Sequence, residues 1–203
     1  MKTHIRVHTL DLTLIALFVA LMGIGANITT WVPFLQIGGV PITLQTFFCF
    51  LSGALLGSRR GAISMIVYVL VGVIGIPVFA GLKGGLGTIF SPTFGFIISF
   101  IVTAYMVGKV IEFTRKPTSL IFVIASLVGL VFNYLIGTNY MYFSLAFFMD
   151  ATESITYSKA WLIMLAYLPV DLLTIGAAAM VAPRIYDTFQ RTNPIGIKTR
   201  VTN

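Results

Sequence analysis

The sequence predicts an all-α integral membrane protein with six transmembrane helices and Gly/Pro-rich outer loops that cap a pocket. Three observations support this fold class. Of the 203 residues, 58% are hydrophobic and only 9% are charged, with a mean hydropathy of +0.99, whereas a soluble domain carries about 25% charged residues. The apolar residues form long segments without the period-two alternation of a membrane barrel. The charged residues fall mostly in short breaks between these segments.

The six expected spans follow from the length of about 20 mostly apolar residues that a helix needs to cross a bilayer. We place them at about 10–27, 44–57, 61–76, 93–111, 120–137 and 160–182, within a single membrane domain, 1–203, that ends in a cytoplasmic tail, 184–203. The second is too short to cross unless preceding residues join it, or unless it begins below the membrane surface in a protein-lined cavity.

The distribution of cations predicts the orientation. Six spans place both termini on one side, and if that side is the cytoplasm, only Lys83 and Lys159 of the 13 Lys and Arg residues lie outside. Cytoplasmic loops of membrane proteins carry such an excess of Lys and Arg. We therefore expect a multi-pass protein of the cell membrane with both termini cytoplasmic. The net charge of +7 then needs no nucleic-acid partner, and the lipid bilayer is the expected surrounding.

The connections on the expected outer side are long and rich in glycine, proline or aromatic residues, at 29–45, 77–92 and 139–159. The inner connections are short and basic. Irregular chain near a bilayer is tolerated where it is buried in protein or lines a cavity. We expect the outer connections to fold back over the helices and the binding site to open outward.

Two charged residues are the strongest site candidates. Asp171 lies well inside the last span, where a carboxylate costs about 2.5–3.5 kcal/mol on insertion scales, and Pro169 favours a kink nearby. Asp171 either contacts a ligand or hydrogen-bonds a Tyr or Thr of a neighbouring span. Lys83, in the glycine-rich run 81–87, either contacts a ligand or is a solvated loop lysine.

Other polar and aromatic residues in the same outer half suit a compact ligand with an apolar body and a few hydrogen-bonding groups. These candidates are Thr43, Gln45, Thr88, Asn133, Tyr134 and Tyr140, with Trp31 among the aromatic residues.

The first span carries Ala16, Ala20 and Gly23 at spacings of four and three, which leaves one narrow stripe almost without side chains. Another helix can pack closely on such a stripe, either from the same chain or from a second membrane protein.

Enzyme signatures are mostly missing from the sequence. No two carboxylates lie in one span, and no Gly-x-Ser-x-Gly motif occurs. His4 and His8 have the i, i+4 spacing of a metal pair, but no Glu lies between them and they precede the first span. We therefore expect no enzyme activity, no catalytic residues, no metal site and no cofactor.

Four segments resemble signature segments of the BioY family, the biotin-binding S components of energy-coupling factor (ECF) transporters. They are Val40-Pro-Ile-Thr-Leu-Gln-Thr46, Gly53-Ala-Leu-Leu-Gly57, Gly75-Ile-Pro-Val-Phe-Ala-Gly81 and Ser91-Pro-Thr-Phe-Gly-Phe96. The resemblance covers residues 16–182. It implies a six-helix S component with an outward-facing biotin pocket, and a transmembrane T component with two ATPase subunits as partners.

The resemblance also implies roles for single residues. Ala16 and Ala20 match the family's Ala-xxx-Ala docking motif. The stretch from Pro169 to Thr174 resembles the family's Pro-Gly-Asp-x-x-Lys, whose Asp contacts biotin; Asp171 is kept, whereas Thr174 replaces the Lys. Lys83 matches a cation common in the family's loop. Which group meets the biotin carboxylate therefore stays open.

The expected function is biotin uptake, with biotin bound from outside and delivered inward together with the T component and the ATPases. An ionised Asp171 could accept charge-assisted hydrogen bonds from the ureido N–H groups of biotin, and Lys83 could neutralise its carboxylate. The alternatives are an S component or solitary carrier for another small vitamin, or a membrane-embedded enzyme, which would need a catalytic pair not found in the sequence.

Overall fold

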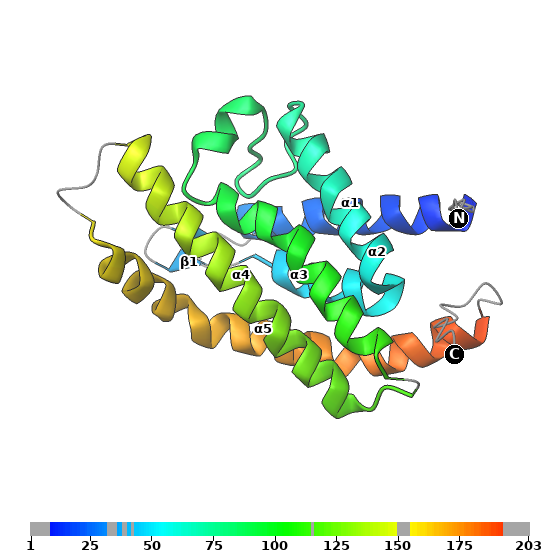
Figure 1. Ribbon diagram of the computed structural model, residues 1–203. Coiled ribbons are helices and arrows are strands. Elements are labelled where there is room, and N and C mark those ends of the chain that lie inside the picture. The colour runs from blue at the N-terminus through cyan, green and yellow to red at the C-terminus, as the bar shows by residue number, and fades with distance from the viewer. Residues whose placement is uncertain are drawn as a thin grey trace, which may run out of the picture.

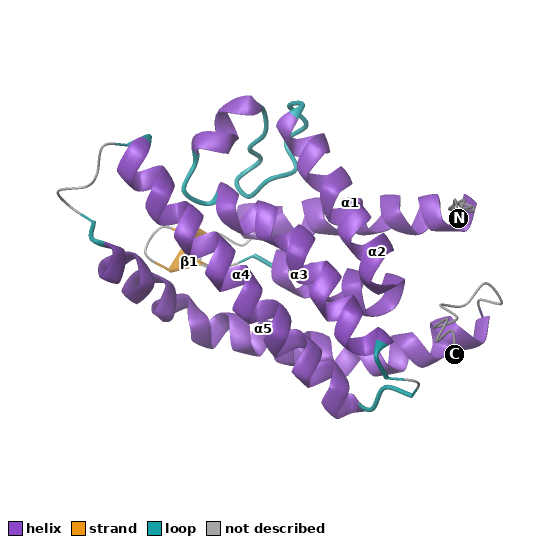
Figure 2. Cartoon of the chain, in the orientation of Figure 1, coloured by secondary structure: helices purple, strands orange, loops and turns teal. Residues whose placement is uncertain are grey.

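A computed structural model describes residues 9–31, 36–37, 40–41, 43–114, 116–149 and 155–192. Its elements are α1 (Thr9–Trp31), β1 (Gln36–Ile37), β2 (Val40–Pro41), α2 (Gln45–Val73), η1 (Leu86–Phe90), α3 (Phe94–Glu112), α4 (Ser119–Phe147) and α5 (Tyr157–Thr192). Among these described residues, five helices are long and apolar enough to cross a membrane. Figure 1 shows α3 and α4 side by side, with α5 along the other side of α4. Figure 2 shows that the described part is helical apart from connections and one short strand pair.

Large apolar side chains lie both in the core and on the outside of the helices, where they suit a lipid environment. On α4, Leu127, Val131 and Leu135 recur every four residues on the exposed side. Ser126 and Asn133 lie on the buried side of the same helix. The outward stripe suits hydrocarbon, and the inner positions leave polar groups to pair across helices.

The prediction of six separate helices is not confirmed, because the second and third expected spans belong to one element, α2. This element is sharply bent at Gly57, whose φ of 81° and ψ of 174° are non-helical. A Cβ placed on Gly61 would lie 2.9 Å from the Cα of Gly53, although residues eight apart in a straight helix are about 12 Å apart. The chain therefore folds back at one glycine without the connecting loop that the sequence suggested.

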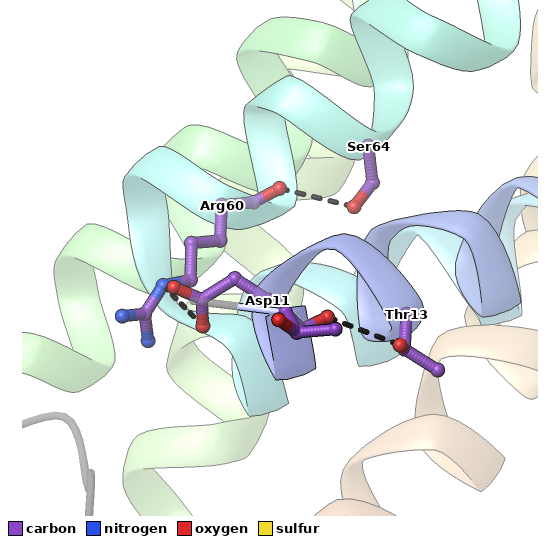
Figure 3. Close-up of polar contacts among 5 residues, drawn as sticks. Asp11, Thr13, Arg60 and Ser64 are labelled. Atoms are coloured by element: carbon purple, nitrogen blue, oxygen red, sulfur yellow. Dashed lines mark hydrogen bonds and ion pairs between the residues drawn. The ribbon is translucent and has the colours of Figure 1, made fainter. Parts of the chain in front are cut away.

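Acidic side chains hold the bend of α2 to its neighbours. The Ser58 backbone N–H and hydroxyl donate to the two carboxylate oxygens of Glu112 in α3, at 2.7 and 2.8 Å. Figure 3 shows Asp11 of α1 paired with Arg60 of α2, at 3.2 Å between Oδ1 and Nε. The first backbone N–H groups of the second half of α2 have no acceptor within the helix, and Glu112 places a negative charge beside them. These contacts tie three helices together at one end of the bundle.

The connection 77–92 folds back onto the helices, as predicted for this segment. The Asn27 side-chain oxygen in α1 accepts the Leu82 N–H at 2.7 Å, and the Tyr68 hydroxyl in α2 donates to the Val78 carbonyl at 3.0 Å. From α4, Tyr140 and Ser144 donate to carbonyls of η1. Helix side chains therefore hold the backbone of this connection at several points.

Two helices extend further than the expected spans. α4 continues to Phe147, so the third outer connection is shorter than the predicted 139–159. α5 is continuous from Tyr157 to Thr192 and contains Pro169 and Pro183. Part of the expected tail is thus helical, and residues 193–203 lie outside the described chain. The start of the segment 9–31 and the end of the segment 157–192 lie on the same side of Figure 1.

Candidate functional site

Asp171 lies where three helices meet. The Tyr134 hydroxyl of α4 donates to Asp171 Oδ2 at 2.6 Å, and the Thr46 side chain at the start of α2 also hydrogen-bonds the carboxylate. The interhelical alternative from the sequence is therefore observed. A carboxylate has two oxygens with about four lone-pair directions in total. Two hydrogen bonds orient the group and leave capacity for further donors.

Gln45, the residue before Thr46, connects this junction to the outer connection. Its side-chain N–H donates to the Tyr68 hydroxyl at 2.9 Å, and that hydroxyl donates to the Val78 carbonyl. Tyr68 is fully buried. Gln45 thus faces the connection 77–92, and the next residue, Thr46, faces Asp171.

Sequence reasoning missed Thr46 and Tyr68. Thr46 follows Gln45 in one of the signature-like segments, so that segment was the available signal. Tyr68 is a tyrosine inside an apolar span, and a buried tyrosine hydroxyl usually needs a polar partner. Asp171 is distant from Thr46 along the chain, and Val78 reaches Tyr68 only because the connection 77–92 folds back onto α2.

Three of the predicted site residues make contacts elsewhere. Asn133 donates to the Ser99 hydroxyl of α3 at 2.8 Å. Thr88 donates to the Gly85 carbonyl within its own connection at 2.6 Å, and Tyr140 donates to a carbonyl of η1. These contacts hold helices and the outer connection in place, and none of them reaches Asp171.

Thr174 and Thr43 lie near the Asp171 junction along the chain. Thr174 follows Asp171 by about one turn of α5, and its hydroxyl donates to the Val170 carbonyl at 2.9 Å. A hydroxyl that donates one hydrogen bond can still accept another. Thr43 is partly buried just before α2. The side chain of Trp31 lies outside the described part of the structure.

Lys83 is exposed on a turn in which its backbone pairs with that of Phe79, at 3.0 and 3.2 Å. This connection lies on the opposite side of the bundle from α5, as the teal segment at the top of Figure 2 shows. Within the described residues, no contact joins Lys83 to Asp171. The placement favours the alternative of a solvated loop lysine.

The small-residue stripe of α1 is divided between two surroundings. Ala16 and Ala20 are exposed on the outside of the bundle. Gly23 is partly buried, and a Cβ there would lie 3.5 Å from the Val78 side chain. Gly23 therefore packs against the connection 77–92, whereas Ala16 and Ala20 face outward. Gly23 lies about 10 Å further along the helix than Ala16, which brings it beside this connection.

An apolar crevice lies further along α5, away from Asp171. Residues from α2, α3, α4 and α5 line a narrow crevice with no room for a water molecule, and no charged side chain lines it. Its α5 members, Ala178 and Ala182, follow Asp171 by about two to three turns. The crevice is part of the packed core and is separate from the candidate site. Among the residues that the structure describes, no group of three or more His, Cys, Asp or Glu could hold a metal ion.

A family model and individual relatives both relate this chain to the BioY family. The model of the BioY family matches residues 1–191. A protein of Bacillus subtilis (strain 168) named BioYB is 42% identical over 181 residues, which are 89% of this chain and 90% of the relative. A protein of Rhodobacter capsulatus named biotin transporter BioY is 36% identical over 180 residues, covering 86% of this chain and 92% of the relative.

A solved crystal structure has the same fold. It is described as the S-component for biotin from an ECF-type ABC transporter, and it aligns with a TM-score of 0.74 over 92% of this chain and 95% of that chain. The two sequences are 23% identical, so this likeness concerns the arrangement of the helices.

Proposed function

The chain belongs to the BioY family, and from this membership we propose that it takes up biotin as the substrate-binding S component of an ECF transporter. It is a multi-pass membrane protein that binds biotin from the outside and delivers it inward. Because its relatives are named as transporters, we assign no catalytic step to this chain. The observation that carries the proposal is the Asp171 carboxylate, oriented by two other helices at the middle of the last span.

The chemistry of biotin suits this carboxylate. The ureido ring of biotin offers two N–H donors, and a carboxylate accepts such bonds with charge assistance, which makes them about twice as strong as neutral ones. Tyr134 and Thr46 hold the carboxylate in a fixed orientation, so less ordering is needed when the ligand binds. Thr174 lies about one turn from Asp171 on α5, and its hydroxyl can accept a further bond from the ligand.

The position of Asp171 also explains the short first half of α2. Asp171 is at the centre of the expected span 160–182, so its bond to Thr46 supports placing the start of α2 near the middle of the membrane. Residues 45–56 then extend about 18 Å, enough for half of a hydrocarbon core of about 30 Å. The second half of α2, residues 58–73, extends about 24 Å and returns across most of the membrane.

We propose on this basis that the two halves of α2 act as separate membrane segments, which restores six segments. Both termini are then on one side, in agreement with Figure 1, where the start of α1 and the end of α5 lie on the same side. The bend of α2 carries Arg59 and Arg60 on that same side. The positive-inside rule makes that side the cytoplasm.

The proposed partners are a transmembrane T component and two ATPase subunits, which supply the energy for inward release. The exposed Ala16 and Ala20 on α1 support a docking surface, because small residues allow two helices to approach closely.

Equilibrium binding of labelled biotin to the purified, detergent-solubilised chain tests the function. We expect binding well below micromolar Kd, with competition by unlabelled biotin and no competition by thiamine or riboflavin. Micromolar or weaker affinity would contradict the proposal, and displacement by another vitamin would redirect it to that substrate. Buffer-exchanged protein from biotin-depleted cells serves as the starting material, so that retained biotin does not mask the sites.

A further inference from the structure

Thr138 of α4 carries an unpaired polar group in the protein interior. Its side chain is fully buried. Among the side chains that the structure describes, its Oγ1 is the buried nitrogen or oxygen atom that has no hydrogen-bond partner. A buried hydroxyl without a partner is unfavourable, because it has lost its bonds to water and gained none in return.

The Thr138 hydroxyl does not donate to the carbonyl four residues earlier, a bond that other hydroxyl groups of this protein form. Five other hydroxyl groups donate to the carbonyl four residues earlier in their own helix: Thr13, Ser64, Ser126, Thr174 and Thr188. For Thr138, the carbonyl of Tyr134 is at the same spacing, yet no bond joins them. The hydroxyl of Thr138 therefore does not make the local bond that such side chains commonly form, and its donor remains unused.

The place of Thr138 on α4 relates it to the candidate site. It lies about one turn beyond Tyr134, and residues four apart share a helix side. Tyr134 contacts Asp171 of α5. One turn beyond Thr138, Tyr142 packs edge-to-face on Tyr157 of α5, with the ring centroids 5.3 Å apart. Thr138 thus lies between two contacts with α5, on the outer side of Asp171.

We infer that Thr138 donates a hydrogen bond to an oxygen of the bound substrate. The inference rests on the proposed function and adds a specificity residue to the same site. A ligand whose N–H groups bind Asp171 arrives from the outside, and its remaining polar groups are oxygens, which need donors. Thr138 offers an unused donor on that outer side. A molecule without a matching oxygen would leave this hydroxyl unpaired, and such a cost is a strong source of discrimination.

The test compares two substitutions at this position with one at a bonded hydroxyl. Thr138→Val removes the hydroxyl and keeps the shape, and Thr138→Ser keeps the hydroxyl. Thr103→Val is the matched control, because Thr103 is equally buried and its hydroxyl donates to the Gly129 carbonyl at 3.4 Å. The Kd for labelled biotin and the unfolding temperature without added biotin are measured for each.

We expect Thr138→Val to weaken biotin binding about tenfold, the loss of one hydrogen bond, without lowering the unfolding temperature. Thr138→Ser should stay within about threefold of the wild-type Kd. Thr103→Val should lower the unfolding temperature and leave the Kd unchanged. Lost affinity without lost stability is a combination that a purely structural hydroxyl would not produce.

The inference is overturned if Thr138→Val binds biotin within twofold of the wild type, or if the Ser variant loses as much affinity as the Val variant. It is also overturned if Thr138→Val lowers the unfolding temperature as Thr103→Val does. If Val prevents folding, Thr138→Ala replaces it with the same criteria. Wild-type protein that fails to bind biotin refutes the proposed function itself, whereas wild-type binding with an unaffected Thr138→Val refutes this inference alone.

Discussion

Replacing Tyr134 by Phe removes the hydroxyl that donates to Asp171 and leaves the aromatic ring in place. The ring contacts, including the edge-to-face contact with Phe96 at 6.5 Å, are kept, so the change isolates one hydrogen bond. That bond is 2.6 Å long and ends on a carboxylate. Bonds to charged groups contribute about 1.5–3 kcal/mol in water-soluble proteins, and interhelical bonds in membranes usually less.

We therefore expect Tyr134→Phe to cost about 1–2 kcal/mol in biotin binding, which raises the Kd about 5- to 30-fold. The reason is that Asp171 then keeps only the bond to Thr46 and must be ordered when the ligand binds. Equilibrium titration of the solubilised variant with labelled biotin measures this change. Tyr105→Phe is the control, because Tyr105 is 39% exposed on α3 and should bind as the wild type does.

An unchanged Kd in Tyr134→Phe would mean that the orientation of Asp171 does not matter for the ligand. A lower Kd would mean that Tyr134 competes with the ligand for the carboxylate oxygens. Either result would refute the reasoning that Tyr134 prepares Asp171 for binding.

Gly57→Ala should lower the free energy of unfolding by about 1–3 kcal/mol, because the φ and ψ of residue 57 suit glycine alone. Thermal unfolding in detergent measures this loss. Gly87→Ala is the control and should be nearly neutral, because no atom lies within 4 Å of the added Cβ. Glu112→Gln should lower stability by about 1–3 kcal/mol, since an amide oxygen replaces only one of two carboxylate acceptors at the bend; an unchanged unfolding temperature would contradict this role. Lys83→Ala should leave the biotin Kd within twofold, and a tenfold loss would instead place Lys83 at the ligand.

The positions of the helices were largely predictable because hydrophobic length and charge distribution are local properties of the chain. The bend at Gly57 was not, since a single glycine followed by Arg59 and Arg60 is typical of a loop between two helices. The structure satisfies the polar groups at that place with Glu112 and Asp11, from α3 and α1. Such long-range partners do not appear in a local pattern.

The site was predictable only in part, for a related reason. Asp171 was identifiable because a carboxylate inside an apolar span is unusual, and the sequence of that span alone shows it. Asn133 and Gly23 also lie in spans, but their roles depend on which way each helix turns them, toward Ser99 and Val78. Thr46 bonds Asp171 because α2 begins deep in the bundle. No spacing rule in the sequence could indicate where this helix begins.

The most direct measurement is the biotin affinity of Asp171→Asn compared with that of Asp11→Asn. Both changes remove a single negative charge, but Asp11 pairs with Arg60 at the bend of α2, away from Asp171. We predict that Asp171→Asn raises the Kd at least tenfold while Asp11→Asn leaves it within twofold, in titrations of equally folded protein. Wild-type affinity in Asp171→Asn would contradict the claim that this carboxylate binds the ureido group.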